Sequence, residues 1–523
     1  MWWRVESHAG SAWECAGPKP VWRPALLPFA KRCGCQIAPA PVNPQIFRWR
    51  PLKQWLRSAV RIHDITHVFY TPPVHSSMKL TVPPLAVAAA AATMVLCSCK
   101  STTSTSRAAN TPPPGFTALF NGTNLDGWWG ADTEDPRSYL DLPPAEFQKK
   151  HDASLDNIRQ HWSVQHGELV NDGHGLFLTS DQFYGDFELL VDYQTVPLAD
   201  SGVYLRGCPQ VQIWDYTEQA KFKLGADKGS GALWNNSPGA PGKDPLVKAD
   251  KPFGQWNHFR IIMVGSRVWV WLNGKQTVAG ATMENYYNRK RPVPPRGPIQ
   301  LQTHGGEIRW RNVFIRDIGS AEANRRLRGT DPAGFKSVFD GRDFAGWQGP
   351  VNNYEVKDGA LQCRAGKGGT IYTTAEFTNF VARLEFKLPP GGNNGLAIRY
   401  PGHGDTAYDG MCECQVLDDH YEQATGQTID PRQAHGSAYG MVAAERGYQH
   451  PIGDWNYEEV TVKGHTIQVE LNGTQILDAD LSKVTEFMHN SPHPGRDRTS
   501  GHFGFAGHND PVMFRNISIE PLP

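Results

Sequence analysis

Short segments in which apolar and polar residues alternate dominate the chain, and helical periodicity is rare. Residues 186–193 and 201–206 show this alternation, and residues 379–386 and 394–399 show it again. A period of two residues is typical of β-strands with one buried face. The exception is segment 143–160, which we expect to form a helix or a cap over one face. The pattern predicts an all-β protein.

The same sequence pattern occurs twice along the chain. Segment 115–128 returns as 334–347, and the similarity continues towards the C-terminus. In each copy an Asn-Gly pair, Asn273-Gly274 or Asn472-Gly473, separates two alternating segments, which is a strong hairpin signal. We therefore expect two tandem jelly-roll β-sandwiches, each made of two antiparallel sheets packed face to face. The expected ranges are 115–318 for domain one, 319–333 for a polar linker and 334–523 for domain two.

The region before domain one has the pattern of a secretory signal. Residues 78–98 begin with Met-Lys, continue as an apolar run rich in Ala, and end with small residues before Cys99. This order predicts a lipoprotein signal peptide, cleaved before a lipidated Cys99. A transmembrane anchor is the alternative, but Pro83-Pro84 interrupts a run of marginal length. We expect 99–114 to be a tether, and 1–77 to be a start-site artefact or a leader without a fold. The expected location is the cell envelope, lipid-anchored and facing the periplasm or the outer membrane.

Composition narrows the possible partners. The 523 residues include 52 Lys plus Arg and 52 Asp plus Glu, so the formal net charge is zero and nucleic-acid binding is not expected. Abundant Trp, Tyr, Phe, Gly and Pro suit short strands joined by turns, and aromatic-lined sugar sites. Four cysteines lie in the two domains, too few for a disulfide framework in domains of this size. Cys412 and Cys414 are expected to fill the core.

The candidate chemistry lies on two predicted strands of each copy. In domain two, Gly395 and Arg399 share one face of the first strand, and Glu413 and Gln415 share a face of a later strand. If the two cysteines fill the core, Glu413 and Gln415 line a groove. The corresponding residues of domain one are Arg206, then Gln210 and Gln212, so the glutamate of domain two is replaced by Gln210.

Several short motifs of domain two together resemble the 3-keto-disaccharide hydrolase family, a concanavalin-like jelly-roll domain. They are Asn394-Gly395-Leu396-x-x-Arg399, Glu413-x-Gln415-Val416-Leu417-Asp418, Gly453-x-Trp455-Asn456, Leu471-Asn472-Gly473 and Phe514-Arg515-Asn516-Ile517. Domain one resembles a variant in which Gln210 takes the glutamate position. The resemblance implies cleavage of glycosides already oxidised at C3 of the sugar.

A C3 ketone acidifies the proton on C2, so a base can remove that proton and the glycosidic oxygen on C1 can leave by elimination. Water then adds back to give net hydrolysis. This route needs a base, a group that stabilises the enolate, and an acid for the leaving group. On the strength of the resemblance and the strand faces, we assign Glu413 as the base, Arg399 as the cation facing the enolate, and His508 or His435 as proton donor. His508 aligns with His304 of domain one.

Other polar and aromatic residues are assigned to carbohydrate binding. In domain two they are Gln415, Asp418 and Tyr439, and in domain one they are Arg206, Gln210, Gln212, Trp214, Asp215, Trp234 and His304. Trp214 and Trp234 have no Trp equivalents in domain two, which makes them candidates for stacking on a sugar ring. The tryptophans that recur in both copies, Trp128, Trp256, Trp347 and Trp455, are expected in the cores. No cofactor is predicted. A divalent cation held by His403, Asp405 and Asp409 is the alternative to a polar loop there.

Three functions stay open. The leading one is an enzyme that cleaves 3-keto-glycosides with domain two, domain one being a diverged enzyme or a sugar-binding module. The others are a non-catalytic carbohydrate-binding lipoprotein, bound to the membrane only through its lipid, and a cell-surface interaction protein. An ordinary retaining glucanase is disfavoured, because Asp418 lies an odd number of residues after Glu413 and the two carboxylates point apart unless the strand has a bulge.

Overall fold

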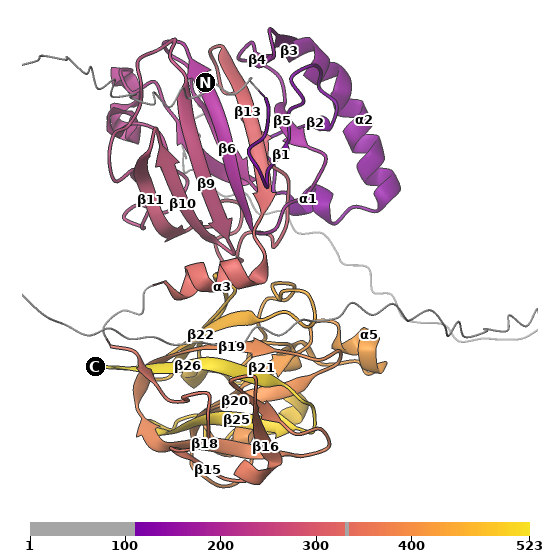
Figure 1. Cartoon of the computed structure of the whole chain (residues 1–523), viewed down its shortest axis with the longest axis vertical. Helices are drawn as coiled ribbons and strands as arrows, with labels where there is room; N and C mark the ends of the chain where they lie inside the picture. Colours follow the sequence, from indigo (N-terminus) through magenta and orange to yellow (C-terminus); the bar gives the residue numbers. More distant parts are fainter. Residues whose placement is uncertain (1–109, 330–333) are drawn as a thin grey trace, which may run out of the picture. The chain divides into compact units, whose positions relative to one another are not determined.

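The structure, a computed structural model, describes residues 110–329 and 334–523. Domain one consists of two antiparallel sheets (Figure 1). Its strands are β1 (Thr117–Ala118), β2 (Trp128–Ala131), β3 (Trp162–Gln165), β4 (Glu168–Asn171), β5 (Phe177–Ser180), β6 (Phe187–Thr195), β7 (Ser201–Leu205), β8 (Cys208–Ile213), β9 (Asn257–Val264), β10 (Arg267–Leu272), β11 (Lys275–Thr282), β12 (Gln300–Leu301) and β13 (Ile308–Asp317). One sheet has the order β11-β10-β9-β6-β13-β4-β3, with β1 paired to β13, and the other has the order β2-β5-β12-β7-β8.

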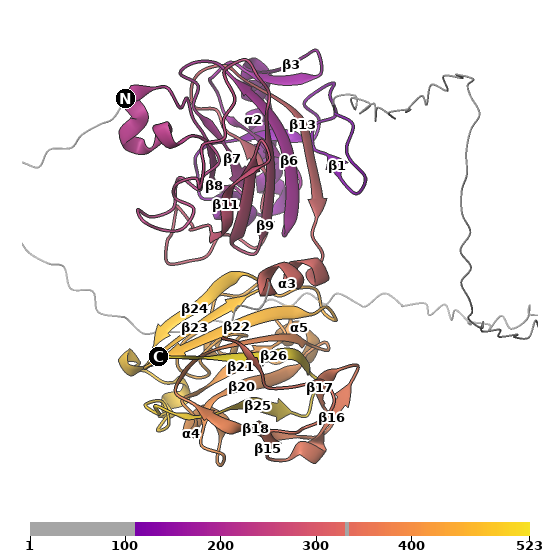
Figure 2. The same cartoon turned by 60° about the vertical axis from the view of Figure 1, so that its left-hand side comes forward.

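Domain two repeats this arrangement (Figure 2). Its strands are β14 (Lys336–Ser337), β15 (Trp347–Gln348), β16 (Tyr354–Lys357), β17 (Ala360–Cys363), β18 (Gly368–Phe377), β19 (Asn379–Lys387), β20 (Asn393–Tyr400), β21 (Cys412–Leu417), β22 (Asn456–Lys463), β23 (Thr466–Leu471), β24 (Thr474–Asp480), β25 (Gly501–His508) and β26 (Met513–Leu522). The larger sheet runs β16-β17-β26-β19-β22-β23-β24, with β14 on β26, and the smaller runs β15-β18-β25-β20-β21.

The two domains correspond strand by strand, and each has its own apolar core. β8 pairs with β7 at one edge of the smaller sheet, as β21 pairs with β20 in domain two. The prediction of two tandem all-β jelly-roll sandwiches is confirmed. Cys208, Cys363, Cys412 and Cys414 are buried and free, and the last two lie in the core of domain two as expected.

The segment expected to be a helix or cap is helix α2 (Pro144–His161), which follows the short helix α1 (Arg137–Leu140). Proline starts α2, where its missing N–H is not needed. Trp129 of β2 packs against Tyr139, Phe147 and Leu155, so both helices cover the outer face of β2 (Figure 1). The predicted helix is therefore confirmed, and it occurs in domain one alone.

The Asn-Gly hairpins form as predicted. Leu272 pairs with Lys275, and Leu471 pairs with Thr474, so each Asn-Gly pair is a two-residue turn. Both turn residues have positive φ: 50° and 79° in domain one, 49° and 80° in domain two. This is the conformation of a type I′ turn, which Asn and Gly adopt at little cost.

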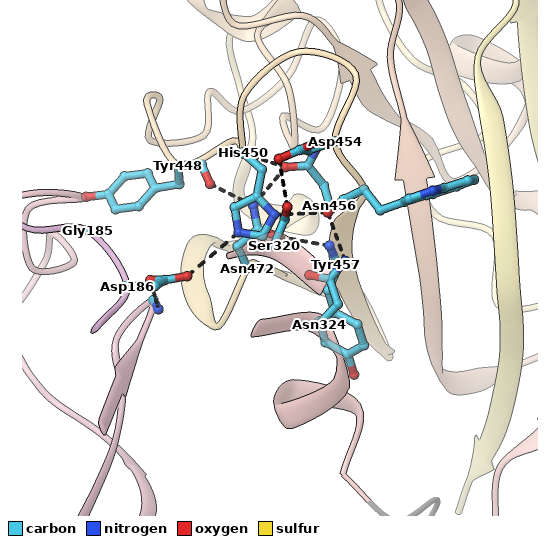
Figure 3. A network of polar contacts seen from close by, with 12 residues as sticks. Gly185, Asp186, Ser320, Asn324, Tyr448, His450, Asp454, Asn456, Tyr457 and Asn472 are labelled. Atoms are coloured by element: carbon cyan, nitrogen blue, oxygen red, sulfur yellow. Dashed lines mark hydrogen bonds and ion pairs between the residues drawn. The ribbon is translucent and has the colours of Figure 1, made fainter. Parts of the chain in front are cut away.

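An asparagine pair ties each hairpin to the chain that enters the adjacent strand, and Figure 3 shows the pair of domain two. Asn472 Nδ2 donates to Asn456 Oδ1 at 2.8 Å, and Asn456 Oδ1 also accepts from the backbone of His450 at 2.7 Å. Asn273 and Asn257 of domain one make the same 2.8 Å bond. The Trp-Asn and Leu-Asn-Gly motifs therefore meet in space, where they hold β22 and β9 at their starting residues.

Helix α3 (Ser320–Arg328) lies within the segment expected to be a linker. Ala323 and Leu327 pack with Ile262 and Val264 of β9. The first residue of α3, Ser320, donates through its Oγ to Asp454 Oδ2 at 2.7 Å (Figure 3).

Two of the tryptophans expected in the cores are elsewhere. Trp128 and Trp347 belong to the cores as predicted. Trp256 and Trp455 are only partly buried, and the guanidinium groups of Arg311 and Arg515 each lie 3.9 Å from the centre of their rings. The core prediction is wrong for this pair, because a stacked arginine covers the ring in place of apolar side chains.

The expectations for residues 1–99, including the signal peptide and lipidated Cys99, lie outside the described residues. Within 110–329 and 334–523, no helix has the length and apolar character needed to cross a membrane.

Candidate functional site

A pocket of about 310 Å³ opens over the smaller sheet of domain two, beside β20 and β21. It is lined mainly by polar and aromatic side chains. These are Asn393, Asp405, Tyr408, Glu413, Gln415, Tyr421, Gln427, Thr428, Gln433, Tyr439 and His508, with Ala407, Leu417 and Ile429. A wall of hydroxyl, amide and aromatic groups suits a sugar ring, which offers both hydroxyl groups and apolar C–H faces.

Glu413 and His508 form the ionisable centre of the pocket. His508 Nε2 lies 3.4 Å from Glu413 Oε1, and the two residues come from β21 and β25. Glu413 is buried to 5% exposure, whereas the His508 side chain is 47% exposed. The hydrogen bond with Glu413 raises the pKa of His508 above its ordinary value. A largely buried carboxylate beside an accessible imidazole is an arrangement suited to proton transfer.

Glu413 lies over Gly395 because that position has no side chain. A Cβ atom at Gly395 would overlap Oε1, Cγ and Cδ of Glu413. Beside it, Gln415 Nε2 donates to Asn393 Oδ1 at 2.7 Å. Gln415 Oε1 is buried and has no hydrogen-bond partner among the described residues. Free buried polar groups of this kind at a pocket are available to a bound ligand or to water.

We expect Gly395→Ala to displace the Glu413 carboxylate and to lower turnover of a cleavable glycoside by roughly 10²-fold, because a shift of about 1 Å in a catalytic group has effects of that size. The matched control is Gly202→Ala in domain one, where the new Cβ would approach Gln210 Cδ at 3.0 Å. Steady-state kinetics, with thermal melting to check folding, would test this. Equal turnover in the two variants would show that Glu413 does not need its observed position.

Arg399 is not in the pocket. It has a φ of +48°, and the β20–β25 register shifts between Ala397 and Tyr400, so the alternation of faces ends before it. Its guanidinium donates to the backbone oxygens of Thr378, Gly464 and Arg498 at 2.7–2.8 Å. The prediction that it shares a face with Glu413 is wrong, because the left-handed backbone conformation of Arg399 itself turns its side chain towards buried carbonyl groups.

His435 is also misplaced in the sequence-based assignment. It is 2% exposed, its ring centre lies 4.9 Å from that of Phe386 in the core, and its Nε2 lies 3.8 Å from Glu458 Oε1. Burial lowers the pKa of His435 to about 3. The core position separates it from the pocket and from solvent, so the structure leaves His508 as the accessible histidine beside Glu413.

Of the residues assigned to binding in domain two, Gln415 and Tyr439 line the pocket and Asp418 does not. Gln433 Nε2 lies 3.2 Å from the Tyr439 hydroxyl and donates to it, which leaves the hydroxyl proton free to donate. The Asp418 carboxylate accepts from the backbone N–H groups of Gly391 and His420 at 2.8 and 2.9 Å. Asp418 therefore shapes a turn, and it does not join Glu413 as the second carboxylate of a retaining glucanase.

In domain one, the equivalent face brings Gln210, Gln212 and His304 together around Asp200. Gln210 Nε2 donates to Gln212 Oε1. Gln212 Nε2 donates to Asp200 Oδ1 at 2.8 Å, and His304 Nδ1 lies 3.2 Å from Asp200 Oδ2. The sequence-based assignment included the first three residues and missed Asp200.

The other residues assigned to binding in domain one have different surroundings. Arg206, with a φ of +54°, donates to Gly185 O and Asp186 Oδ1, as a structural counterpart of Arg399. Asp215 accepts from the backbone of Leu198 and Thr217, as Asp418 does in its own turn. Trp214 is 5% exposed and meets Trp234 edge to face at 5.6 Å, and Lys243 lies 4.5 Å above the Trp234 ring. Trp214 is therefore too buried to serve as an open stacking platform, whereas Trp234 is partly exposed.

Sequence reasoning missed several residues of the pocket in domain two, and it missed Asp200 in domain one. Asn393 and Asp200 lie two positions before Gly395 and Gly202, so the same alternation that selected the glycines could have found them. Tyr408 and Tyr421 lie in the short helices α4 (Thr406–Asp409) and α5 (Tyr421–Thr425), Asp405 and Gln427 lie beside these helices, and none of the four carries a periodic signal. Across the described ranges, no group of three or more His, Cys, Asp or Glu side chains is arranged to hold a metal ion. Asp405 instead accepts from the backbone of Ala407, and Asp409 accepts from that of Asp405.

The family of the chain is decided by a sequence comparison. A model of the 3-keto-alpha-glucoside-1,2-lyase-like domain matches residues 115–316 and again 334–520. The chain belongs to this family, with two copies. Family membership therefore covers domain one, in which Gln210 stands at the position of Glu413.

Individual proteins are similar to part of this chain. A 3-keto-disaccharide hydrolase of Bacteroides thetaiotaomicron is 25% identical over 248 residues, which are 40% of this chain and 86% of that protein. Two solved proteins of Parabacteroides distasonis, provisionally described as glycosyl hydrolases, are 25% and 28% identical. Each match covers 36% of this chain and 94% or 99% of the solved chain, with a TM-score of 0.32.

Proposed function

We propose that domain two cleaves 3-keto-glycosides by elimination followed by hydration, with Glu413 and His508 as the acid–base pair. The observation that carries the proposal is the 3.4 Å contact between a 5%-exposed carboxylate and an accessible imidazole in a sugar-sized polar pocket. The family match supplies the substrate class, a sugar with a ketone at C3.

The chemistry runs in two stages. The Glu413 carboxylate takes the proton from C2, which the neighbouring ketone has acidified, and the electron pair forms a C2–C3 enolate. The C1–O bond then breaks as the C1–C2 double bond forms, and protonated His508 gives its proton to the departing oxygen. Water adds across the C1–C2 double bond and returns the 3-keto-sugar. His508 is suited to the acid role because its hydrogen bond to Glu413 raises its pKa.

The enolate oxygen needs a donor, and Arg399 is bonded to backbone carbonyls elsewhere. Tyr439 takes this role in the proposal. Its hydroxyl accepts from Gln433, so its own proton is free, and burial raises its pKa and keeps it protonated. Membrane attachment through Cys99 remains a prediction from the sequence and is proposed with the same envelope location.

The test follows hydrogen at C2. In D₂O, methyl 3-keto-α-D-glucopyranoside should give 3-keto-glucose that carries deuterium at C2, because elimination removes that proton and hydration replaces it. Direct hydrolysis would leave C2–H intact, so product without deuterium beyond the rate in buffer overturns the elimination route.

The same experiment separates the two residues. His508→Asn should retain exchange at C2 while release of methanol falls, because the base remains and the acid for the leaving group is lost. Loss of both exchange and release in this variant, with folding intact, would contradict the division of roles.

A further inference from the structure

A polar cluster surrounds Gly202 in domain one, and the proposed reaction does not use it. Gly202 pairs with Gln212 of β8, and Gly202 O accepts from the backbone N–H of Gln302 at 2.9 Å. A Cβ atom at Gly202 would lie 3.0 Å from Gln210 Cδ, so the Gln210 side chain covers this glycine. Asp200 and His304 lie two positions from Gly202 and Gln302, which places them on the same face.

Four of the differences between the copies fall on this face. The register of β7 and β12 against that of β20 and β25 aligns Gly202 with Gly395 and Leu301 with Phe505. Asp200 therefore replaces Asn393, Gln302 replaces Ala506, Tyr204 replaces Ala397, and Gln210 replaces Glu413. In domain two the carboxylate belongs to Glu413 of β21, whereas in domain one it belongs to Asp200, which directly precedes β7. A histidine lies beside the carboxylate in both copies, His508 in domain two and His304 in domain one.

Asp200 is held by three neighbouring polar groups. Its carboxylate accepts from Gln212 Nε2 at 2.8 Å and lies 3.2 Å from both Lys221 Nζ and His304 Nδ1. The hydrogen bond to Asp200 raises the pKa of His304, so this histidine gains positive charge. These contacts engage both oxygens of the Asp200 carboxylate, and Gln210, which has no carboxylate, occupies the position of the proposed base Glu413.

Two buried acceptors of the cluster have no donor. Gln210 is 4% exposed and Gln302 is 6% exposed, and their Oε1 atoms lack a hydrogen-bond partner among the described residues. Leaving a buried carbonyl unpaired costs free energy, so such groups usually meet a ligand or an ordered water. Both need a donor such as a hydroxyl group. His304, with a side chain 59% exposed, keeps the cluster in contact with solvent.

We infer that Asp200, Gln210, Gln302 and His304 form a second carbohydrate site, which binds the hydroxyl groups of an unoxidised hexose without cleaving it. Hydroxyl protons supply the donors that Gln210 and Gln302 lack, and the exposed imidazole edge of His304 faces the sugar oxygens. This site is independent of the reaction in domain two.

The experiment uses the whole chain, with the ring ¹⁵N signals of His304 and His508 observed by NMR. The probes are methyl α-D-glucopyranoside, galactopyranoside and mannopyranoside. At least one of them should shift the His304 signal with a saturable midpoint. Asp200→Asn and Gln302→Ala should each raise that midpoint at least tenfold. Turnover of methyl 3-keto-α-D-glucopyranoside by domain two should stay unchanged in both variants.

Both variants copy residues that domain two tolerates at equivalent positions, Asn393 and Ala506, so at least one is expected to fold. Asp156→Asn is the control, because that side chain is 97% exposed on α2. A His304 signal unmoved by all three glycosides, as expected if water alone occupies the cluster, overturns the inference. An unchanged midpoint in a folded Asp200→Asn or Gln302→Ala variant also overturns it. Failure of the turnover assay alone would count against the function of domain two and not against this site.

Discussion

Glu413→Gln should reduce turnover of methyl 3-keto-α-D-glucopyranoside by roughly 10³-fold, within the usual range for loss of a general base. The amide keeps the shape of the side chain and can still hydrogen-bond His508, so the loss reports the missing proton acceptor. We expect the Michaelis constant to change little, because the substitution removes a group that acts mainly in the transition state.

Domain one supplies the control for this variant. Gln210 occupies the position of Glu413, and Gln210→Ala should leave turnover unchanged. A second measurement does not depend on catalysis: the pKa of His508, followed by NMR, should fall towards its ordinary value in Glu413→Gln, because the hydrogen bond with the carboxylate is what raises it. If turnover survives in Glu413→Gln and disappears in Gln210→Ala, the active copy is domain one and the proposed assignment is wrong.

Glu458→Gln should stabilise domain two against unfolding at alkaline pH, by on the order of 5 kcal/mol above pH 8. Glu458 is fully buried in the core, beside His435 and with Cys414 Sγ 3.9 Å from its Oε1. Burial raises its pKa from 4.5 to about 8. The folded state therefore keeps a proton that the unfolded state loses, and stability falls as pH rises from about 4.5 to 8. Glutamine cannot titrate, so the variant does not show this fall.

His435 has the opposite effect on the pH dependence of stability. Its pKa is lowered to about 3, so between about pH 6.5 and 3 the unfolded state binds a proton at this residue and the folded state does not. The free energy of unfolding therefore falls as the pH falls through this range. Wild-type stability should thus be greatest between about pH 4.5 and 6.5, and it should decline on both sides. Urea unfolding of the chain at several pH values would measure the decline in the free energy of unfolding on the acidic and the alkaline side.

Glu486→Gln is the control for Glu458→Gln, because Glu486 is exposed. Parallel pH profiles for wild type and Glu458→Gln would show that Glu458 is not the group whose burial opposes ionisation.

The fold could be predicted from the sequence because its signals are local and repeated. Alternation, the Asn-Gly turns and the duplication each depend on neighbouring residues, and the structure confirms the sandwiches that they indicate. Alternation also placed Glu413 and Gln415 correctly, since β21 runs without a register shift against β20.

The assignment failed where a local irregularity or a distant contact decides the position of a side chain. Arg399 follows the expected spacing, yet its positive φ sends it to buried carbonyl groups that no periodicity reveals. His435 lies in a connecting segment, and only the folded chain shows that it turns into the core beside Glu458. Asp405 and Tyr421 reach the pocket from the segments before and after β21, where no alternation indicates which side chains face the pocket.

The asparagine pairs that join each hairpin to the start of its neighbouring strand have a consequence for recognising related proteins. Trp-Asn and Leu-Asn-Gly recur in both domains because they close the same backbone geometry, through Asn257 with Asn273 and Asn456 with Asn472. A search based on these motifs will collect sandwiches of this kind whether or not they can remove a proton from a sugar. Under the proposed mechanism, the residue that separates the two kinds faces Gly395 or Gly202 in the smaller sheet, and it is Glu413 in domain two and Gln210 in domain one.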